Sequence, residues 1–135
     1  MGIFVWNDSY SVKVAVCDAQ HQKLFETMNE LADAMKNRKG QETLSKTACD
    51  LLVYTKTHFR DEEALLRMAK YPALVEHERQ HQGFVDRVEK LADDLLKKRP
   101  TNAVQVLTFL QDWLTNHIRK SDRAYSGHLN TYGIR

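Results

Sequence analysis

Apolar side chains recur at steps of three and four residues along most of this 135-residue chain. This spacing puts them on one face of an α-helix, because a helix turns once every 3.6 residues. Short connections between such helices make neighbouring helices run antiparallel. The chain is therefore predicted to be all-α, an up-down-up-down antiparallel four-helix bundle. The predicted helices cover residues 18–38, 41–69, 73–98 and about 101–122.

The residues expected at helix ends stand where the apolar pattern stops. Asp18 is a suitable N-cap for the first helix, and Gly40 suits the left-handed residue after its end. Pro72 stops the second helix and suits the first turn of the third. These residues predict where the bundle helices begin and end.

The segment before the first helix has a different composition. Ile3–Trp6 and Val12–Val16 are short runs rich in β-branched residues, too short to build a sheet. They are expected to pack over the bundle, with Trp6 as an apolar anchor. The whole chain, residues 1–135, is then one domain made of an N-terminal arm, a bundle and a tail, at residues 1–17, 18–122 and 123–135.

Polar side chains interrupt the apolar faces near one end of the predicted bundle. A single histidine on an apolar face is most often a hydrogen-bonded core residue. Five imidazoles and two carboxylates in one core are costly to bury unless a common partner uses their lone pairs. The set therefore predicts a metal site, and its members come from all four helices: His21, His58, Glu62, His77, His81, His117 and Asp122.

The order of these residues along the helices allows one site. His21 is near the start of the first helix and His58 is late in the second. His77 is early in the third helix and His117 is near the end of the fourth. In an antiparallel bundle all four positions meet at the same end.

The ligand types narrow the choice of metal. The set contains no thiolate, which argues against structural zinc, whereas imidazole with carboxylate suits iron and, less well, manganese. Seven ligands exceed the needs of one ion, so two ions are expected. If both are octahedral, five imidazoles, two bridging carboxylates (Glu62 and Asp122) and one bridging oxo or hydroxo oxygen leave one position open.

Composition excludes several classes of function. The net charge of +2 with mixed signs gives no case for nucleic-acid binding. No apolar stretch reaches the roughly 20 residues that a membrane span needs, and the first eight residues do not resemble a signal peptide. A cytoplasmic protein is expected, with Cys17 and Cys49 as buried free thiols. Nothing in the sequence implies an oligomer.

The same motifs carry a resemblance to a known family. Asp18-Ala19-Gln20-His21, His58-Phe59-Arg60-Asp61-Glu62-Glu63, His77 followed by His81, and Trp113-Leu114-Thr115-Asn116-His117-Ile118 ending in Asp122 together resemble the single-domain bacterial hemerythrins. The resemblance implies two iron ions with a bridging oxo or hydroxo group, and reversible binding of O2 for transport, storage or delivery. An enzymatic activity is not expected, and an oxygen-consuming enzyme is one candidate recipient of the O2.

The resemblance also divides the ligands between the two ions. It implies that His77, His81 and His117 hold one iron, while His21 and His58 hold the other, which keeps the open position. Glu62 and Asp122 bridge the pair. Thr115 and Tyr54 are expected to face solvent and to pack, respectively, although either hydroxyl could instead reach the site.

Two other functions stay open. Hemerythrin-like domains also act as sensing modules, and this chain would then need a partner that carries the output. A di-iron oxidase, peroxidase or nitric-oxide-handling enzyme is the third alternative. It is disfavoured because the ligands include no Glu-x-x-His motif and the inward faces hold no spare acid or base.

Overall fold

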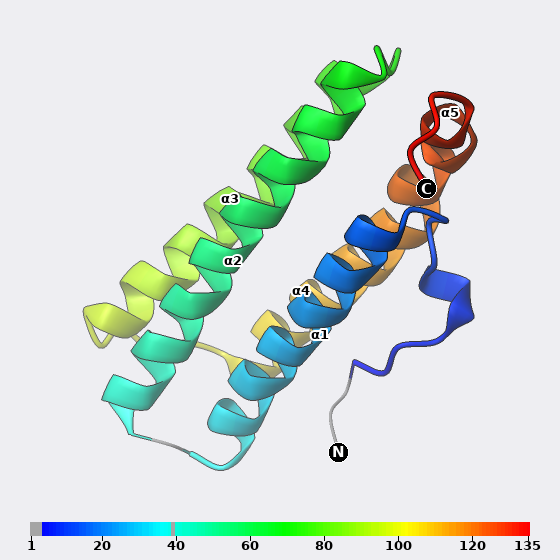
Figure 1. The fold of residues 1–135 in the computed structure, drawn as a ribbon. Helices are drawn as coiled ribbons and strands as arrows, with labels where there is room; N and C mark the ends of the chain where they lie inside the picture. Colours follow the sequence, from blue (N-terminus) through cyan, green and yellow to red (C-terminus); the bar gives the residue numbers. More distant parts are fainter. Residues whose placement is uncertain (1–3, 39) are drawn as a thin grey trace.

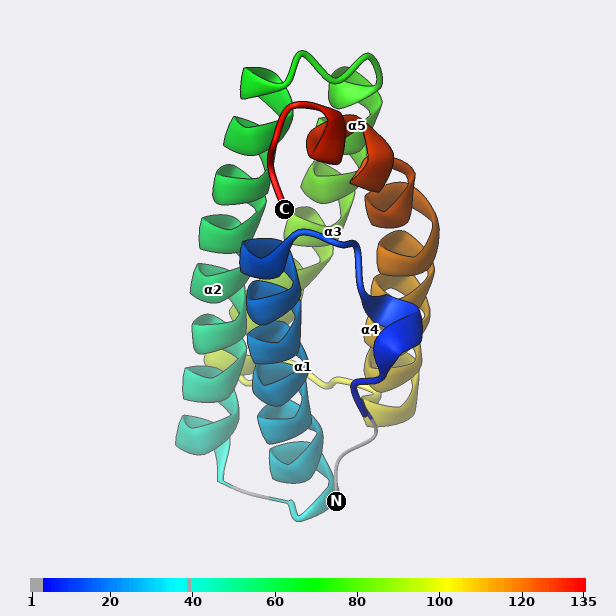
Figure 2. The same cartoon turned by 45° about the vertical axis from the view of Figure 1, so that its right-hand side comes forward.

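Four long antiparallel helices make up the computed structural model, which describes residues 4–38 and 40–135 (Figure 1). The part of the arm prediction that concerns residues 1–3 lies outside them. The all-α bundle prediction is confirmed: α2 packs against both α1 and α3, and α1 lies beside α4 (Figure 2). The elements in chain order are the 3₁₀ turn η1 (Asp8–Tyr10), α1 (Ala15–Lys36), α2 (Gln41–Met68), α3 (Leu74–Leu96), α4 (Ala103–Asn116), the π-helix η2 (His117–Asp122) and α5 (Ser126–Thr131).

The core forms where the predicted apolar faces meet. On α1 the buried face includes Leu24, Met28 and Leu31, at steps of three and four. On α2, Leu66 is fully buried, whereas Leu65 is only partly buried. Leu66 follows the buried Glu62 by one helical turn, and this places it on the same face.

The arm is packed on the bundle as predicted, but Asp18 has a different role. Helix α1 begins at Ala15, so Asp18 lies in its first turn rather than at its cap. The Asp18 carboxylate accepts hydrogen bonds from the Ser11 hydroxyl at 2.7 Å and the Val12 amide at 2.8 Å. Trp6 is half-buried, with its ring centroid 5.6 Å from that of Phe25. Asp18 therefore ties the arm to the helix.

The prediction that Gly40 adopts the left-handed conformation is wrong. Gly40 has φ −58°, and Arg38 is the residue with positive φ, at 50°. Lys70 and Lys98 follow α2 and α3 in the same conformation, with φ of 55° and 57°. A basic side chain at a helix C-terminus interacts favourably with the helix dipole, which helps to offset the cost of left-handed backbone.

The fourth predicted helix is not a regular α-helix to its end. It is α-helical from Ala103 to Asn116 and then continues as a π-helix from His117 to Asp122. In an α-helix, residues five apart point in different directions, whereas the wider π-helix brings them to one face. His117 and Asp122 therefore point to the same side.

Two further properties concern the chain as a whole. Cys17 is buried as predicted, but Cys49 is exposed, so the prediction of two buried thiols is wrong for Cys49. Cys49 follows the buried Ala48 by one residue, which turns it away from the core on α2. Among the residues that the structure describes, no helix is both long enough and apolar enough to cross a membrane.

Candidate metal centre

The seven predicted ligand residues all meet at the end of the bundle where α2 connects to α3. Each is buried, with an exposed fraction of 6% or less. They come from α1 (His21), α2 (His58, Glu62), α3 (His77, His81) and η2 (His117, Asp122). The structure thus brings together every residue of the predicted set.

The ligand atoms form two groups that share Glu62. One group holds Glu62, His77, His81, His117 and Asp122, and the other holds His21, His58 and Glu62. Within each group the ligand atoms lie within 4.8 Å of one another. We call the first the three-histidine group and the second the two-histidine group.

Glu62 divides its two oxygens between the groups. Its Oε1 is 2.9 Å from Nε2 of His77 and 3.1 Å from Nε2 of His81. Its Oε2 is 3.3 Å from Nε2 of His21 and 3.4 Å from Nε2 of His58. The Glu62 carboxylate therefore faces both groups at once.

Asp122 divides its oxygens in the same way. Its Oδ1 is 3.0 Å from Nε2 of His77 and 3.1 Å from Nε2 of His117. Its Oδ2 is 3.1 Å from Nε2 of His21. Each carboxylate thus presents one oxygen to histidines of the three-histidine group and the other to the two-histidine group.

Several of these short contacts are not hydrogen bonds. Nε2 of His21 and Oδ1 of Asp122 are buried and have no hydrogen-bond partner among the residues that the structure describes, although oxygen or nitrogen atoms lie about 3 Å away. Nε2 of His81 and Nε2 of His117 are 3.1 Å apart, and at most one proton can lie between them. Lone pairs that converge without protons to share are what a metal site requires, so these residues fit bound cations.

The charges of the site support the same conclusion. Burial opposes the ionised carboxylates, but the surrounding histidines hold the pKa of Glu62 and of Asp122 below their usual values. Burial likewise opposes protonation of His21 and His77, yet the two carboxylates raise their pKa to about 10 and about 9. Burial lowers the pKa of His58. Two buried anions therefore demand positive charge, from protons or from metal ions.

Three histidines donate from their outer ring nitrogen, Nδ1. His58 donates to Oε1 of Gln20 at 2.6 Å, His81 to Oε2 of Glu63 at 2.7 Å, and His117 to Oε1 of Gln80 at 3.0 Å. A proton held on Nδ1 leaves the Nε2 lone pair free to bind a metal. These three acceptors are not among the predicted site residues. Each directly precedes or follows a ligand in sequence, and this adjacency is the signal that could have found them.

Tyr125 was also absent from the predicted site. It is fully buried, and its hydroxyl donates to Oε2 of Glu62 at 2.9 Å. Its position three residues after Asp122 is the only sequence signal for it. Buried beside it, Cys17 has a pKa raised to about 12, first by burial and then by the Glu62 charge. Tyr125 therefore holds one oxygen of a carboxylate that faces both groups.

Thr115 and Tyr54, whose roles the sequence leaves open, each donate a hydrogen bond to a backbone carbonyl away from the ligand atoms. The Thr115 hydroxyl donates to the carbonyl of Gln111 at 2.8 Å, within its own helix. The Tyr54 hydroxyl donates to the carbonyl of Gln20 at 3.2 Å. Neither hydroxyl is directed at a ligand atom.

Comparison with known proteins gives a consistent result. The sequence profile of the hemerythrin HHE cation binding domain matches residues 12–129. A bacteriohemerythrin of Stenotrophomonas maltophilia is 32% identical, over 98% of this chain and 88% of that protein. A myohemerythrin of Riftia pachyptila is 32% identical, over 93% of each chain. A crystal structure of wild-type hemerythrin superposes with a TM-score of 0.87 at 25% identity, covering 94% of this chain and 98% of that one.

Proposed function

The chain belongs to the hemerythrin family, and we propose that it binds O2 reversibly at a non-haem di-iron centre. The observation that carries the proposal is the division of the two carboxylates: each presents one oxygen to the three-histidine group and the other to the two-histidine group. One ion would be too few for this arrangement. The proposed ligands are His21, His58, Glu62, His77, His81, His117 and Asp122.

The two groups supply unequal numbers of donors. His77, His81 and His117 with one oxygen from each carboxylate make five protein donors for one iron. His21 and His58 with the other two oxygens make four for its partner. With one shared oxo or hydroxo oxygen, the second octahedral iron lacks one donor. We assign O2 binding to that position.

The surroundings of the two-histidine group suit a small neutral gas. His21 and His58 are 0% and 1% exposed, so bulk water does not reach them freely. Leu24, one turn after His21, is fully buried. Burial away from bulk water favours a small neutral ligand over charged reactants.

The chain's own residues have separable tasks in this proposal. The iron pair, when bound, supplies the electrons that make O2 binding reversible. The Nδ1 hydrogen bond from His58 to Gln20 keeps the Nε2 lone pair directed inward. Tyr125 orients Glu62 through its hydroxyl. No acid or base beyond the ligands and their hydrogen-bond partners is needed, so the proposed role is transport, storage or delivery of O2, with an oxygen-consuming enzyme as recipient, rather than catalysis.

Metal analysis and O2 cycling test the proposal. The purified protein should contain about two irons per chain, since two groups of ligands are present. Alternating O2 and argon over the reduced protein should make a visible absorption band appear and disappear repeatedly. His77→Ala should lose iron and the band while keeping its helical circular dichroism. His128→Ala is the matched control, because His128 bonds the carbonyl of Ala69 and lies outside the ligand set.

Two outcomes would contradict the proposal. A single zinc per chain would exclude a di-iron centre. Irreversible bleaching with consumption of peroxide would indicate a di-iron enzyme instead of an O2 carrier.

A further inference from the structure

The outer partners of the ligand histidines are chemically unequal. His58 and His117 donate to neutral side-chain amides, those of Gln20 and Gln80. His81 alone among these three donates to a carboxylate, that of Glu63, and its 2.7 Å contact is short. The difference places a negative charge behind one histidine of the three-histidine group.

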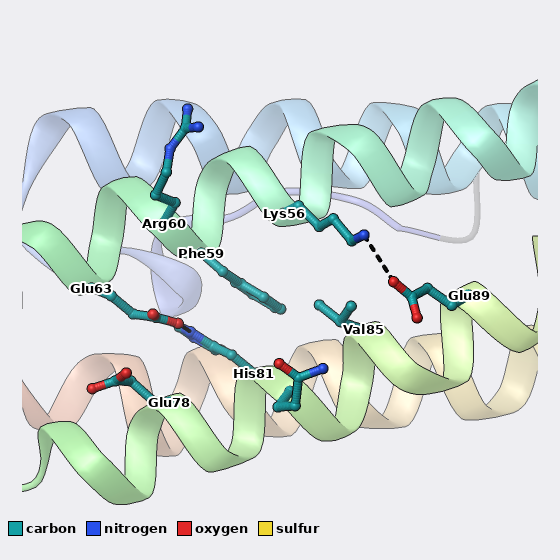
Figure 3. A pocket seen from close by; sticks show the side chains of 9 residues that line it. Lys56, Phe59, Arg60, Glu63, Glu78, His81, Val85 and Glu89 are labelled. Carbon is teal, nitrogen blue, oxygen red and sulfur yellow. Dashed lines mark hydrogen bonds and ion pairs between the residues drawn. The ribbon is translucent and has the colours of Figure 1, made fainter.

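Glu63 reaches His81 from the surface of the molecule. A hollow of about 380 Å³ lies between α2 and α3, and His81 and Glu63 line it together with Phe59, Glu78 and residues of its rim (Figure 3). Figure 3 shows the Glu63 carboxylate beside the imidazole edge of His81. The Glu63 side chain is 20% exposed and that of His81 is 2% exposed. The hydrogen bond thus joins a solvent-reached carboxylate to a buried ligand.

Phe59 holds the imidazole in place for this contact. Its ring stacks on that of His81 with a centroid distance of 3.7 Å and an interplanar angle of 1°. Rotation of the His81 ring about its Cβ–Cγ bond would therefore tilt it out of the stack. Its Nδ1 stays directed at Glu63 while its Nε2 stays directed at Oε1 of Glu62, 3.1 Å away.

We propose that Glu63 is a positioning residue that gives the three-histidine iron a stronger donor than its partner iron has. The proposal rests on the di-iron assignment above and adds an asymmetry in the electronic character of the two ions. A carboxylate that accepts the Nδ1 proton raises the basicity of the imidazole, so that Nε2 binds metal more tightly. A neutral amide acceptor does so less.

The two irons should therefore differ in how firmly they are held and in how well their ferric state is stabilised. The stronger donor stabilises the higher charge of the ferric state and slows the loss of metal from the three-histidine group. The iron of the two-histidine group receives His58, which donates only to an amide, and His21, whose Nδ1 has no hydrogen-bond partner in the described part of the chain. The iron proposed to meet O2 is therefore the more weakly held of the two.

Glu63→Gln tests the proposal, because it keeps the shape of the side chain and removes its charge. Loss of one metal ion to a chelator should become about 10- to 100-fold faster, and the midpoint reduction potential should rise. Chelator competition is measured with Zn²⁺ as well as Fe²⁺, so this readout does not depend on O2 binding. A protein that holds Zn²⁺ in this asymmetric way but fails to bind O2 would contradict the proposed function and leave the present proposal standing.

The matched control is Glu78→Gln, in the same hollow. Among the described residues, Glu78 forms no hydrogen bond with a ligand histidine, so its loss should change neither rate nor potential. Gln80→Glu places a carboxylate behind His117 in the same group. As a single substitution it should slow metal loss. Combined with Glu63→Gln, it should restore much of the metal retention that Glu63→Gln removes.

Equal rates and potentials for Glu63→Gln and Glu78→Gln would overturn the proposal. If Glu63→Gln fails to fold, Gln80→Glu decides the matter by itself: unchanged metal loss in that variant also refutes the proposal.

Discussion

The two ends of the bundle are built in opposite ways. At the end with the α1–α2 and α3–α4 connections, which we call the far end, the buried side chains are apolar, among them Leu31, Ala48 and Leu95. At the metal end, near the α2–α3 connection, the same helices bury five histidines and two carboxylates. One set of helices therefore carries an apolar core at one end and a polar core with two buried carboxylates at the other.

The difference shows which end depends on the metal. Burial of apolar surface stabilises the far end by about 25 cal/mol for each Å² removed from water. Burial of Glu62 and Asp122 costs free energy that neighbouring charge must offset. The far end should thus fold on its own, whereas the metal end should be complete only when ions balance its carboxylates.

Metal removal should have the largest effect, and it should destabilise the metal end far more than the far end. Each bound ion stabilises the folded state by about 4 kcal/mol when its free concentration is a thousandfold above Kd. The metal-free protein should therefore melt at a clearly lower temperature. Hydrogen exchange should accelerate in η2 and in the first turns of α3, and much less near Leu31 and Leu95. Equal acceleration at both ends would remove the proposed distinction.

A cavity at the far end should lower stability without disturbing the metal site. Leu31→Ala removes a fully buried side chain and should lower the free energy of unfolding by about 2–5 kcal/mol, measured by urea denaturation. The iron content of the folded variant should stay unchanged. Leu96→Ala is the control, because Leu96 is 65% exposed, and its stability should be close to that of the parent protein. Loss of iron in Leu31→Ala would show that the ends are coupled.

Thiol labelling should show a smaller effect, and it tests the burial of Cys17 directly. Cys49 is exposed, whereas Cys17 is buried at the metal end, where burial and the charge of Glu62 raise its pKa to about 12. Ellman's reagent at pH 8 should therefore modify one thiol per native chain, and Cys49→Ser should abolish the reaction. Removal of the metal should expose Cys17 to slow labelling. Rapid labelling of both thiols in the metal-loaded protein would contradict the burial of Cys17.

Spacing along the chain predicts the four helices and the inward polar residues that lie three or four positions apart within one helix. His58 and Glu62 share a helix face because they are four residues apart, and so do His77 and His81. The predictions that failed concern backbone and exposure at single positions: Asp18 as a cap, Gly40 as the left-handed residue, and Cys49 as buried. Several residue types satisfy each of those positions, so residue type alone does not decide among them.

Contacts between elements could not be predicted in this way. The acceptors Gln20, Glu63 and Gln80 each meet a histidine of another element. Tyr125 reaches Glu62 across 63 positions of sequence. Such pairs depend on how helices are rotated and shifted against one another, which the periodic pattern leaves open.

The π-helix shows most clearly where the sequence pattern stops determining the structure and packing takes over. Periodicity of three and four residues describes one regular helix and therefore identifies which faces are buried. His117 and Asp122, five residues apart, share a face only because the backbone widens between them. Whether that widening occurs depends on the groups it brings together, here the histidines of α1 and α3 that lie about 3 Å from the Asp122 oxygens. Local pattern determines the helices and their inward residues, and packing determines how the carboxylate oxygens are shared, because that sharing exists only between elements.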